Sequence, residues 1–474
     1  MSRKQKGTKK SVQRRSRVNQ GRLTHSDLLH RALAWVIDEK IFSELSLHGN
    51  TGWTAGQLVI LTVLWVWSSN STLTGAFQEA FHLSTVIGQA AVATYEGLMD
   101  ALVKWTPQLV PLLWARLQIL MQDAGGTYWR VGPWLALAVD GSRVTTPRTK
   151  SNEEAFSAKN YGQGHTAKSR KKRKNKRKRS KKLSTPVKPQ IWLTLIWHMG
   201  LKMPWCWKSG PSTSSERQHF LELLKAHKFP MKTLFCCDAG FVGYELWKTI
   251  IDQGHSFLIR VGGNVRLLRG LGRVRCRDGL VYLWPNAVAR NGQPPLILRL
   301  LEFQGPRGRV YLVTNVLSVE ELTLPQAKQL YKLRWGIELQ FRTFKQTFGR
   351  ANLLSRTAPR ALVELEWSLI GLWVVQLFGA KEQIKIGSPP QNSSAALALA
   401  VIRDTMRMWN SETMSQRELT LRLREAVKDQ YQRTSCKEAR YKPNFKDKPC
   451  ATMPIILEAS AKQKRAYKAL GLAV

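Results

Sequence analysis

The segment from Leu330 to Phe348 places its apolar residues at the spacing of an amphipathic α-helix. Successive residues of a helix advance by about 100°, and on that basis the apolar side chains of this segment fall within a stripe of about 80°. They are Leu330, Leu333, Ile337, Phe341, Phe344 and Phe348. We therefore predict one continuous helix from Leu330 to Phe348 whose apolar stripe packs against a core.

Four polar residues follow the edge of this stripe. Tyr331, Arg334, Glu338 and Lys345 are separated by three, four and seven positions, so they project within about 60° of one another on a helix. One phenol, two cations and one carboxylate therefore line a single edge. A solvated helix surface with an Arg334–Glu338 ion pair, which contributes only about 0.2 to 0.5 kcal/mol, explains the same pattern.

Two further carboxylates follow apolar segments that are typical of buried strands. The run Trp134–Val139 is followed by Asp140, and the run Thr233–Cys237 is followed by Asp238. An acid at the carboxyl edge of such a sheet lies where the ligands of open α/β sheets collect. With Glu338 these residues supply three carboxylates, which can hold two divalent cations, and they predict hydrolysis and transfer of phosphodiesters.

The spacing Tyr-x2-Arg-x3-Glu-x6-Lys resembles, at all four positions, the Tyr-Arg-Glu-Lys signature of bacterial insertion-sequence DDE transposases of the insertion-sequence family 4 type. Asp140-Gly-Ser and Asp238-Ala-Gly-Phe are similar to the first and second acidic motifs of that family and occur in the same order. The resemblance implies an α/β fold. It consists of a ribonuclease-H-like core, with a mixed sheet and flanking helices, a β-rich insertion, and helical N- and C-terminal regions.

The resemblance also implies roles for these residues. Asp140, Asp238 and Glu338 would be catalytic and would hold two Mg²⁺ or Mn²⁺ ions. Three other side chains would bind DNA phosphates beside the scissile bond, and none of them would be a base or a nucleophile: Tyr331, Arg334 and Lys345. The expected activity is cut-and-paste transposition, in which the ends of the element are cleaved and a 3′-hydroxyl is joined to target DNA.

Composition agrees with a nucleic-acid partner. The chain carries 74 Lys and Arg against 32 Asp and Glu, a net charge of +42, and a polyanion offsets self-repulsion of that size. With 43% hydrophobic residues and 18 tryptophans the chain is expected to fold. The resemblance implies double-stranded DNA as the partner, as terminal inverted repeats and target, bound by a homodimer. We expect no ATP, because no Walker-type loop is present.

We predict six regions along the chain. They are a basic arm (1–24), a helical DNA-binding region (25–125, with a helix break at Pro107), the first part of the core (126–260), a β-rich insertion (261–316), the second part of the core (317–380) and a helical C-terminal region (381–474). Residues 163–187 form an exposed basic insertion in the core, since twelve of the fifteen residues 168–182 are Lys or Arg. A nucleic-acid clamp and a nuclear-targeting signal are alternative interpretations of this run.

Two more residues are candidates for DNA contacts. Arg143 lies in the segment Ser142–Lys150, which we expect to be a loop or a second strand rich in phosphate-binding groups. Trp284 lies in the predicted insertion, from which some members of the resembled family stack a tryptophan on a flipped base. Such stacking contributes about 1 to 3 kcal/mol, but a tryptophan of a core or turn is the commoner case.

We expect neither a membrane partner nor an extracytoplasmic location. The apolar segment Leu58–Trp67 is too short to span a bilayer and is predicted to be a buried helix. The six cysteines show no zinc-type spacing and are expected to be reduced, as in the bacterial cytoplasm close to the nucleoid. Two other functions fit the same residues: a structure-specific nuclease of this fold, and a non-catalytic, element-derived DNA-binding protein.

Overall fold

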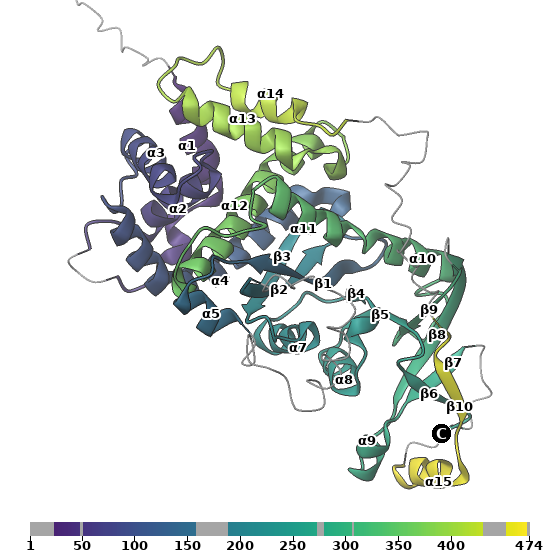
Figure 1. The fold of residues 1–474 in the computed structure, drawn as a ribbon. Coiled ribbons are helices and arrows are strands. Elements are labelled where there is room, and N and C mark those ends of the chain that lie inside the picture. The colour runs from purple at the N-terminus through teal and green to yellow at the C-terminus, as the bar shows by residue number, and fades with distance from the viewer. Residues whose placement is uncertain are drawn as a thin grey trace, which may run out of the picture.

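The computed structural model describes residues 23–47, 51–157, 188–272, 279–305, 308–429 and 452–471. The predicted basic arm up to residue 22 and the basic insertion at 163–187 lie outside these ranges. A mixed sheet runs through the molecule, with helices on both of its faces (Figure 1). The N-terminal helices lie at one end of the molecule, and the β-rich insertion lies at the other (Figure 1).

Five strands form the core of the sheet: β1 (Leu135–Thr145), β2 (Gln190–His198), β3 (Met203–Gly210), β4 (Thr233–Cys237) and β5 (Ser256–Val261). Their order is β3-β2-β1-β4-β5. The β1–β2 and β2–β3 pairs are antiparallel, whereas β1–β4 and β4–β5 are parallel. This is the arrangement of a ribonuclease-H-like core, so the predicted fold class is confirmed.

Helices cover both faces of this core. On one face lie α11 (Gly336–Gln346) and α12 (Ala358–Lys385), and on the other lie α7 (Glu216–Ala226) and α8 (Tyr244–Asp252) (Figure 1). Coverage on both sides explains why β1 and β4 begin as continuous apolar runs rather than alternating ones. The helix α12 is long and apolar enough to span a membrane by length and composition, but 83% of its most apolar window is buried inside the protein.

The N-terminal helices share one hydrophobic core with α12. They are α1 (His25–Val36), η1 (Glu39–Phe42), α2 (Ala55–Trp67), α3 (Leu73–Val86), α4 (Tyr95–Gly125) and η2 (Gly126–Trp129). The indole of Trp67 donates to the carbonyl of Gly371 at 3.0 Å, and Trp367 donates to Thr106 at 2.8 Å. The predicted break at Pro107 is wrong, because α4 continues through this residue while its buried face packs along α12.

The remaining helices lie between the core strands, in or after the insertion and in the C-terminal region. They are α5 (Lys150–Phe156), η3 (Ala239–Phe241), α9 (Asn286–Arg290), α10 (Leu324–Leu333), η4 (Pro390–Asn392), α13 (Ala395–Arg407), α14 (Glu418–Glu425) and α15 (Ala461–Ala469). Of these, α13 and α14 lie beside α1 and α12 (Figure 1).

The β-rich insertion extends the core sheet past β5. Its strands are β6 (Arg266–Arg269), β7 (Leu280–Leu283), β8 (Leu296–Gly305) and β9 (Gly308–Thr314), and β9 pairs with β5. The C-terminal region was predicted to be helical, but it also contains a strand, β10 (Ile455–Glu458), which pairs in parallel with β6. This pairing satisfies the backbone groups of β6, which would otherwise be an exposed edge of the sheet.

The strand β1 is longer than the apolar run that predicts it. It continues beyond Asp140 to Thr145, and this second half pairs with β2 from Leu195 to Gln190. The predicted loop or second strand at Ser142–Lys150 is therefore wrong for its first four residues, which continue the same strand. The antiparallel partner β2 pairs with β1 from Leu137 to Thr145, which the polarity of the segment does not reveal.

The predicted continuous helix from Leu330 to Phe348 is two helices. Between α10 and α11, Arg334 and Trp335 form a tightened turn, in which the amide of Glu338 bonds to the carbonyl of Trp335 at 3.2 Å. Bonds of this i to i−3 type mark a local 3₁₀ turn. The turn brings Gly336 against the buried indole of Trp197.

We expect Gly336→Ala to destabilise the protein by about 1 to 3 kcal/mol, the usual result of overfilling a packed core. A β-carbon at this position would overlap the ring of Trp197, which is 1% exposed. Urea denaturation would measure the change in the free energy of unfolding. The matched control is Gly52→Ala, whose β-carbon would meet no atom within 4 Å. Equal stability of the two variants would contradict the expected clash.

Candidate active site

Asp140 and Asp238 lie side by side at the end of the parallel part of the sheet. The register of β1 and β4 pairs Val139 with Cys237, so the two aspartates are the next residues on neighbouring strands. The amide of Gly141 donates to Oδ1 of Asp140 at 2.9 Å, and that of Gly240 donates to Oδ1 of Asp238 at 2.7 Å. Backbone geometry therefore fixes one oxygen of each carboxylate.

Glu338 is linked to Asp140 by the guanidinium of Arg334. The guanidinium of Arg334, a residue only 5% exposed, has Nη1 at 3.7 Å from Oδ2 of Asp140 and Nη2 at 3.9 Å from Oε1 of Glu338. Both distances exceed hydrogen-bonding range, so these are loose ion pairs. Arg334 thus links Glu338 to Asp140, which neighbours Asp238 through the strand register.

The other two residues of the signature also lie here, although the helix that carries them is broken. Lys345 donates from Nζ to Oγ of Ser142, two residues beyond Asp140, at 2.7 Å. The ring of Tyr331 lies 5.4 Å from the guanidinium carbon of Arg334. The Tyr331 hydroxyl and Nε of Arg334 are buried and have no hydrogen-bond partner among the described residues.

Burial and neighbouring charge disfavour the ionised form of Asp140. Burial, helped by the charges of Asp238 and Glu338, raises the pKa of its carboxyl to about 6. The Gly141 amide and the charge of Arg334 act in the opposite direction. Anions that repel one another in this way are stabilised by any cation that enters between them.

A fourth acid, Glu216, lies at this site and was not predicted. It is the first residue of α7, and burial, followed by the charges of Asp140 and Asp238, raises its pKa to about 7. In the sequence it looks like an ordinary acid in the first turn of a helix, where the helix dipole favours negative charge. Only the packing of α7 on β1 brings it to the aspartates.

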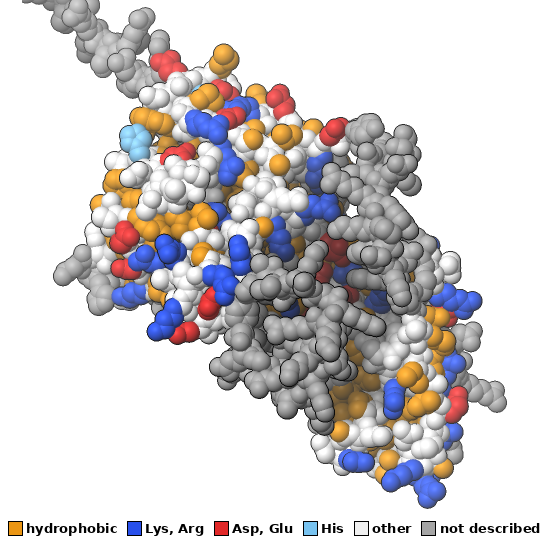
Figure 2. Space-filling model, in the orientation of Figure 1, with side chains coloured by type: hydrophobic (Ala, Val, Ile, Leu, Met, Phe, Trp, Pro, Cys, Tyr) orange, Lys and Arg blue, Asp and Glu red, His pale blue; other side chains and the backbone are white. Residues whose placement is uncertain are grey.

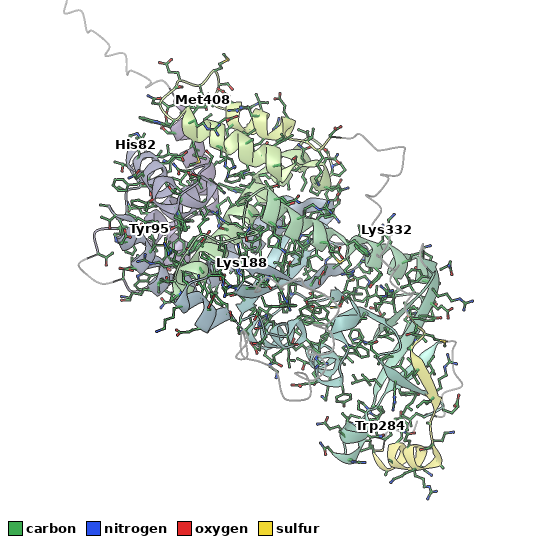
Figure 3. All side chains as sticks on the ribbon, viewed as in Figure 1. His82, Tyr95, Lys188, Trp284, Lys332 and Met408 are labelled. Carbon is green, nitrogen blue, oxygen red and sulfur yellow. The ribbon has the colours of Figure 1, made fainter. Side chains whose placement is uncertain are left out.

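Of the two other DNA-binding candidates, Arg143 lies three residues beyond Asp140 on β1, and Trp284 lies in the insertion. Arg143 is exposed on β1, with its guanidinium 4.5 Å from the ring centre of Trp192. Trp284 is 4% exposed, donates its indole N–H to the carbonyl of Gln293 at 2.9 Å, and packs near Tyr467 at the far end of the insertion (Figure 3). This ring belongs to a small core, so the arrangement does not support the predicted stacking of Trp284 on a base.

The donor set matches a hard divalent cation, because Mg²⁺ and Mn²⁺ prefer carboxylate oxygens. In the arrangement described, no three His, Cys, Asp or Glu side chains of the described residues are grouped closely enough to hold one ion. The guanidinium of Arg334 links Asp140 to Glu338 instead. The residues fit such an ion in type and charge, and the loose Arg334 contacts are ones that a cation can replace.

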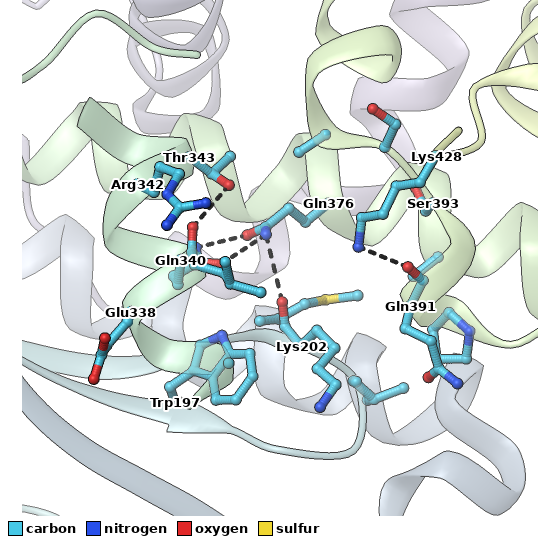
Figure 4. Close-up of a pocket in the computed structure, with 18 of the residues that line it drawn as sticks. Trp197, Lys202, Glu338, Gln340, Arg342, Thr343, Gln376, Gln391, Ser393 and Lys428 are labelled. Carbon is cyan, nitrogen blue, oxygen red and sulfur yellow. Dashed lines mark hydrogen bonds between the residues drawn. The ribbon is translucent and has the colours of Figure 1, made fainter. Parts of the chain in front are cut away.

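A groove of about 810 Å³ begins at Glu338 and runs between α11, the β2–β3 turn and the segment from η4 to the start of α13 (Figure 4). Lys202 and Lys428 line it: Nζ of Lys202 lies over the ring of Trp197, Nζ of Lys428 donates to the carbonyl of Gln391 at 2.6 Å, and neither lysine has an acidic partner among the described residues. Burial and, to a smaller extent, the charge of Lys428 lower the pKa of Lys202 to about 8. Trp335, 55% exposed, also lines this groove.

Comparison with known proteins identifies the family. Residues 135–374, from the start of β1 into α12, match the family model described as "Transposase DDE domain". This chain belongs to the DDE transposase family. The match contains Asp140, Asp238, Glu338 and the whole signature.

A curated relative of this DDE family member is "Transposase InsG for insertion sequence element IS4" of Escherichia coli (strain K12). It is 26% identical over 284 residues, which is 57% of this chain and 59% of the relative. The aligned part thus spans about three fifths of that protein. Among solved structures, a "piggyBac transposase synaptic complex with hairpin DNA" matches over 86% of both chains, at 14% identity and a TM-score of 0.41.

Proposed function

We propose that this chain is a metal-dependent transposase that cleaves DNA at the ends of an insertion element and joins the freed 3′-hydroxyl to target DNA. One observation carries the proposal: Asp140 and Asp238 are in register on parallel strands, and Arg334 ties Glu338 to Asp140. Glu338 is thereby linked to the pair of aspartates, and on this link we base the inference that the three carboxylates act together. The DDE family membership and the bacterial insertion-sequence relative agree with this chemistry.

Asp140, Asp238 and Glu338 would hold Mg²⁺ or Mn²⁺. Bound divalent cations supply charge stabilisation for the phosphorane-like transition state and lower the pKa of the attacking hydroxyl. The backbone amides of Gly141 and Gly240 orient the two aspartates, so these carboxylates need little rearrangement to act as ligands.

Arg334, Tyr331 and Lys345 would position the phosphate that is attacked. The Tyr331 hydroxyl and Nε of Arg334 are buried donors without acceptors among the described residues, and such groups are costly unless a ligand pairs with them. Phosphate oxygens supply the missing acceptors, and Arg334 can bind two of them at once. Lys345, held by Ser142, adds a point charge beside Asp140.

The groove beside Glu338 would take the DNA strand that continues from the scissile phosphate. Lys202 and Lys428 face this groove without acidic partners among the described residues, and Lys and Arg are spread over the visible face of the molecule (Figure 2). Phosphates would offset the repulsion between the two lysines. Homodimerisation on DNA, which the joining of two ends requires, remains part of the proposal.

We expect the double variant K202Q/K428Q to bind end DNA more weakly and with a smaller salt dependence. Each lost phosphate contact lowers the slope of log K against log salt by about 0.7 to 0.9. Fluorescence anisotropy between about 50 and 200 mM salt measures that slope. The matched control is K225Q/K248Q on α7 and α8, where each lysine already has an acidic partner. Equal slopes for the two double variants would exclude the groove as the strand path.

The proposed function is tested with the purified protein and DNA that carries the terminal inverted repeats of its element. Cleavage at the repeats with Mg²⁺, followed by joining to a target plasmid, is the expected result. Cleavage without joining would instead indicate a structure-specific nuclease. Binding without cleavage in Mg²⁺ and in Mn²⁺ would indicate a DNA-binding protein and would overturn the proposal.

A further inference from the structure

Glu216 packs directly against the backbone that carries the two aspartates. A β-carbon on Gly141, the residue after Asp140, would lie 2.5 Å from Oε1 of Glu216. A β-carbon on Gly240, the residue that anchors Asp238, would lie 3.9 Å from Oε2. The two oxygens of Glu216 therefore face the two aspartate-bearing segments, and any side chain at position 141 would occupy the space that the carboxylate fills.

This carboxylate has no protein partner that explains its position. Among the described residues, no hydrogen bond or ion pair reaches Glu216, although it is only partly exposed. Glu222 on the same helix differs, since it pairs with Lys208 at 2.8 Å and accepts a bond from Gln218 at 3.0 Å. The cation whose charge acts on Glu216 is Arg143, and its guanidinium lies over the ring of Trp192. An unpaired carboxylate beside two others is unfavourable unless a cation is present.

A second feature indicates a ligand at Asp140, the residue next to which both Glu216 and Arg334 lie. Arg334, 5% exposed, directs its guanidinium at Asp140 but leaves Nε without a hydrogen-bond partner among the described residues. A cation and a phosphate oxygen entering together would pair with both kinds of unsatisfied group: the excess carboxylates and the buried donor.

We propose that Glu216 is a fourth carboxylate ligand, which together with Asp140 and Asp238 holds a divalent cation on the α7 side of the site. Glu338 approaches from α11 on the opposite face of the sheet, so the two glutamates would reach the aspartates from opposite sides. This inference rests on the proposed metal-dependent function and adds to the three acids of the family signature a residue that lies outside it.

The test measures Mn²⁺ binding by the full-length protein without DNA. Titration followed by electron paramagnetic resonance of free Mn²⁺ gives the Kd for wild type, E216Q and the matched control E222Q. We expect E216Q to raise the Kd at least about tenfold and to reduce the rise in Tm that Mn²⁺ produces. E222Q should match wild type in both the Kd and the rise in Tm, because Glu222 is already paired with Lys208 on β3 and Gln218 on α7.

A role of Glu216 in folding alone predicts another result. In that case E216Q would lower the Tm without metal and leave the Kd for Mn²⁺ unchanged, which would overturn the inference. As a second readout, Fe²⁺ with ascorbate and peroxide should cleave the wild-type backbone near Gly141 and Gly240, and also at the start of α7. Absence of cleavage at α7, with cleavage at the two glycines, would likewise overturn the role of Glu216.

Failure of the inference and failure of the proposed function are distinguishable. If wild type binds Mn²⁺ and cleaves end DNA while E216Q binds Mn²⁺ equally well, only the fourth ligand is refuted. If wild type neither binds Mn²⁺ nor cleaves DNA, the proposed function and the inference are both refuted.

Discussion

Asp140→Asn is expected to reduce DNA cleavage by roughly 10³-fold or more, an activation cost of about 4 kcal/mol. Asparagine keeps the shape of the side chain but removes the charge that would hold a cation. It also removes one of several mutually repelling carboxylates, so the variant should be at least as stable as wild type. Single-turnover cleavage of labelled end DNA in Mg²⁺ measures the rate, and anisotropy measures retained DNA binding.

The control for this variant is Asp252→Asn. Asp252 lies on the surface of α8 and pairs with Lys248, remote from the aspartates on β1 and β4. Its replacement should leave cleavage unchanged. Cleavage by Asp140→Asn at the wild-type rate would show that the acids at the strand ends do not carry the chemistry.

Arg334→Lys is expected to lower cleavage by roughly 10²-fold although the charge is retained. The guanidinium contacts Asp140 and Glu338 with two different nitrogens, and a single ammonium cannot span both carboxylates. It also cannot offer two parallel donors to a phosphate. The same single-turnover assay should therefore show a slower chemical step, with DNA binding and its salt slope nearly unchanged.

Arg342→Lys is the matched control for this change. Arg342 lies on the same helix, α11, where it lines the groove and makes no ion pair with the described residues, and lysine keeps its charge there. The Arg342→Lys variant should cleave DNA at the wild-type rate. If Arg334→Lys were also fully active, Arg334 would contribute charge alone, and its proposed bidentate contact with the phosphate would be wrong.

Much of the site could be predicted because its signals are local. The order of Asp140, Asp238 and Glu338 along the chain, together with the spacing around Arg334, indicates both the family and the fold. The apolar runs before the two aspartates predict buried parallel strands, and β1 and β4 are such strands. Their register then brings the aspartates together, as expected for acids at one edge of a sheet.

Other features could not be predicted, because they depend on partners far away in the chain. Periodicity describes one segment, so it could not show that Gly336 meets Trp197 and that the predicted helix breaks at Arg334 and Trp335. Polarity could not show that β2 lengthens β1 past Asp140, or that β10 closes the edge at β6. The sequence around a tryptophan does not show whether its ring is buried or exposed, so the burial of Trp284 could not be predicted.

The sequence by itself determined which residues can perform chemistry, since residue types and spacings are read directly and the strand and helix patterns follow from local sterics and polarity. Only the tertiary structure decided which of them meet. Arg334 bridges Asp140 and Glu338, and Glu216 joins Asp140 and Asp238, because sheet register and helix packing fix distances between segments that are far apart in the chain. Such distances have no local signature.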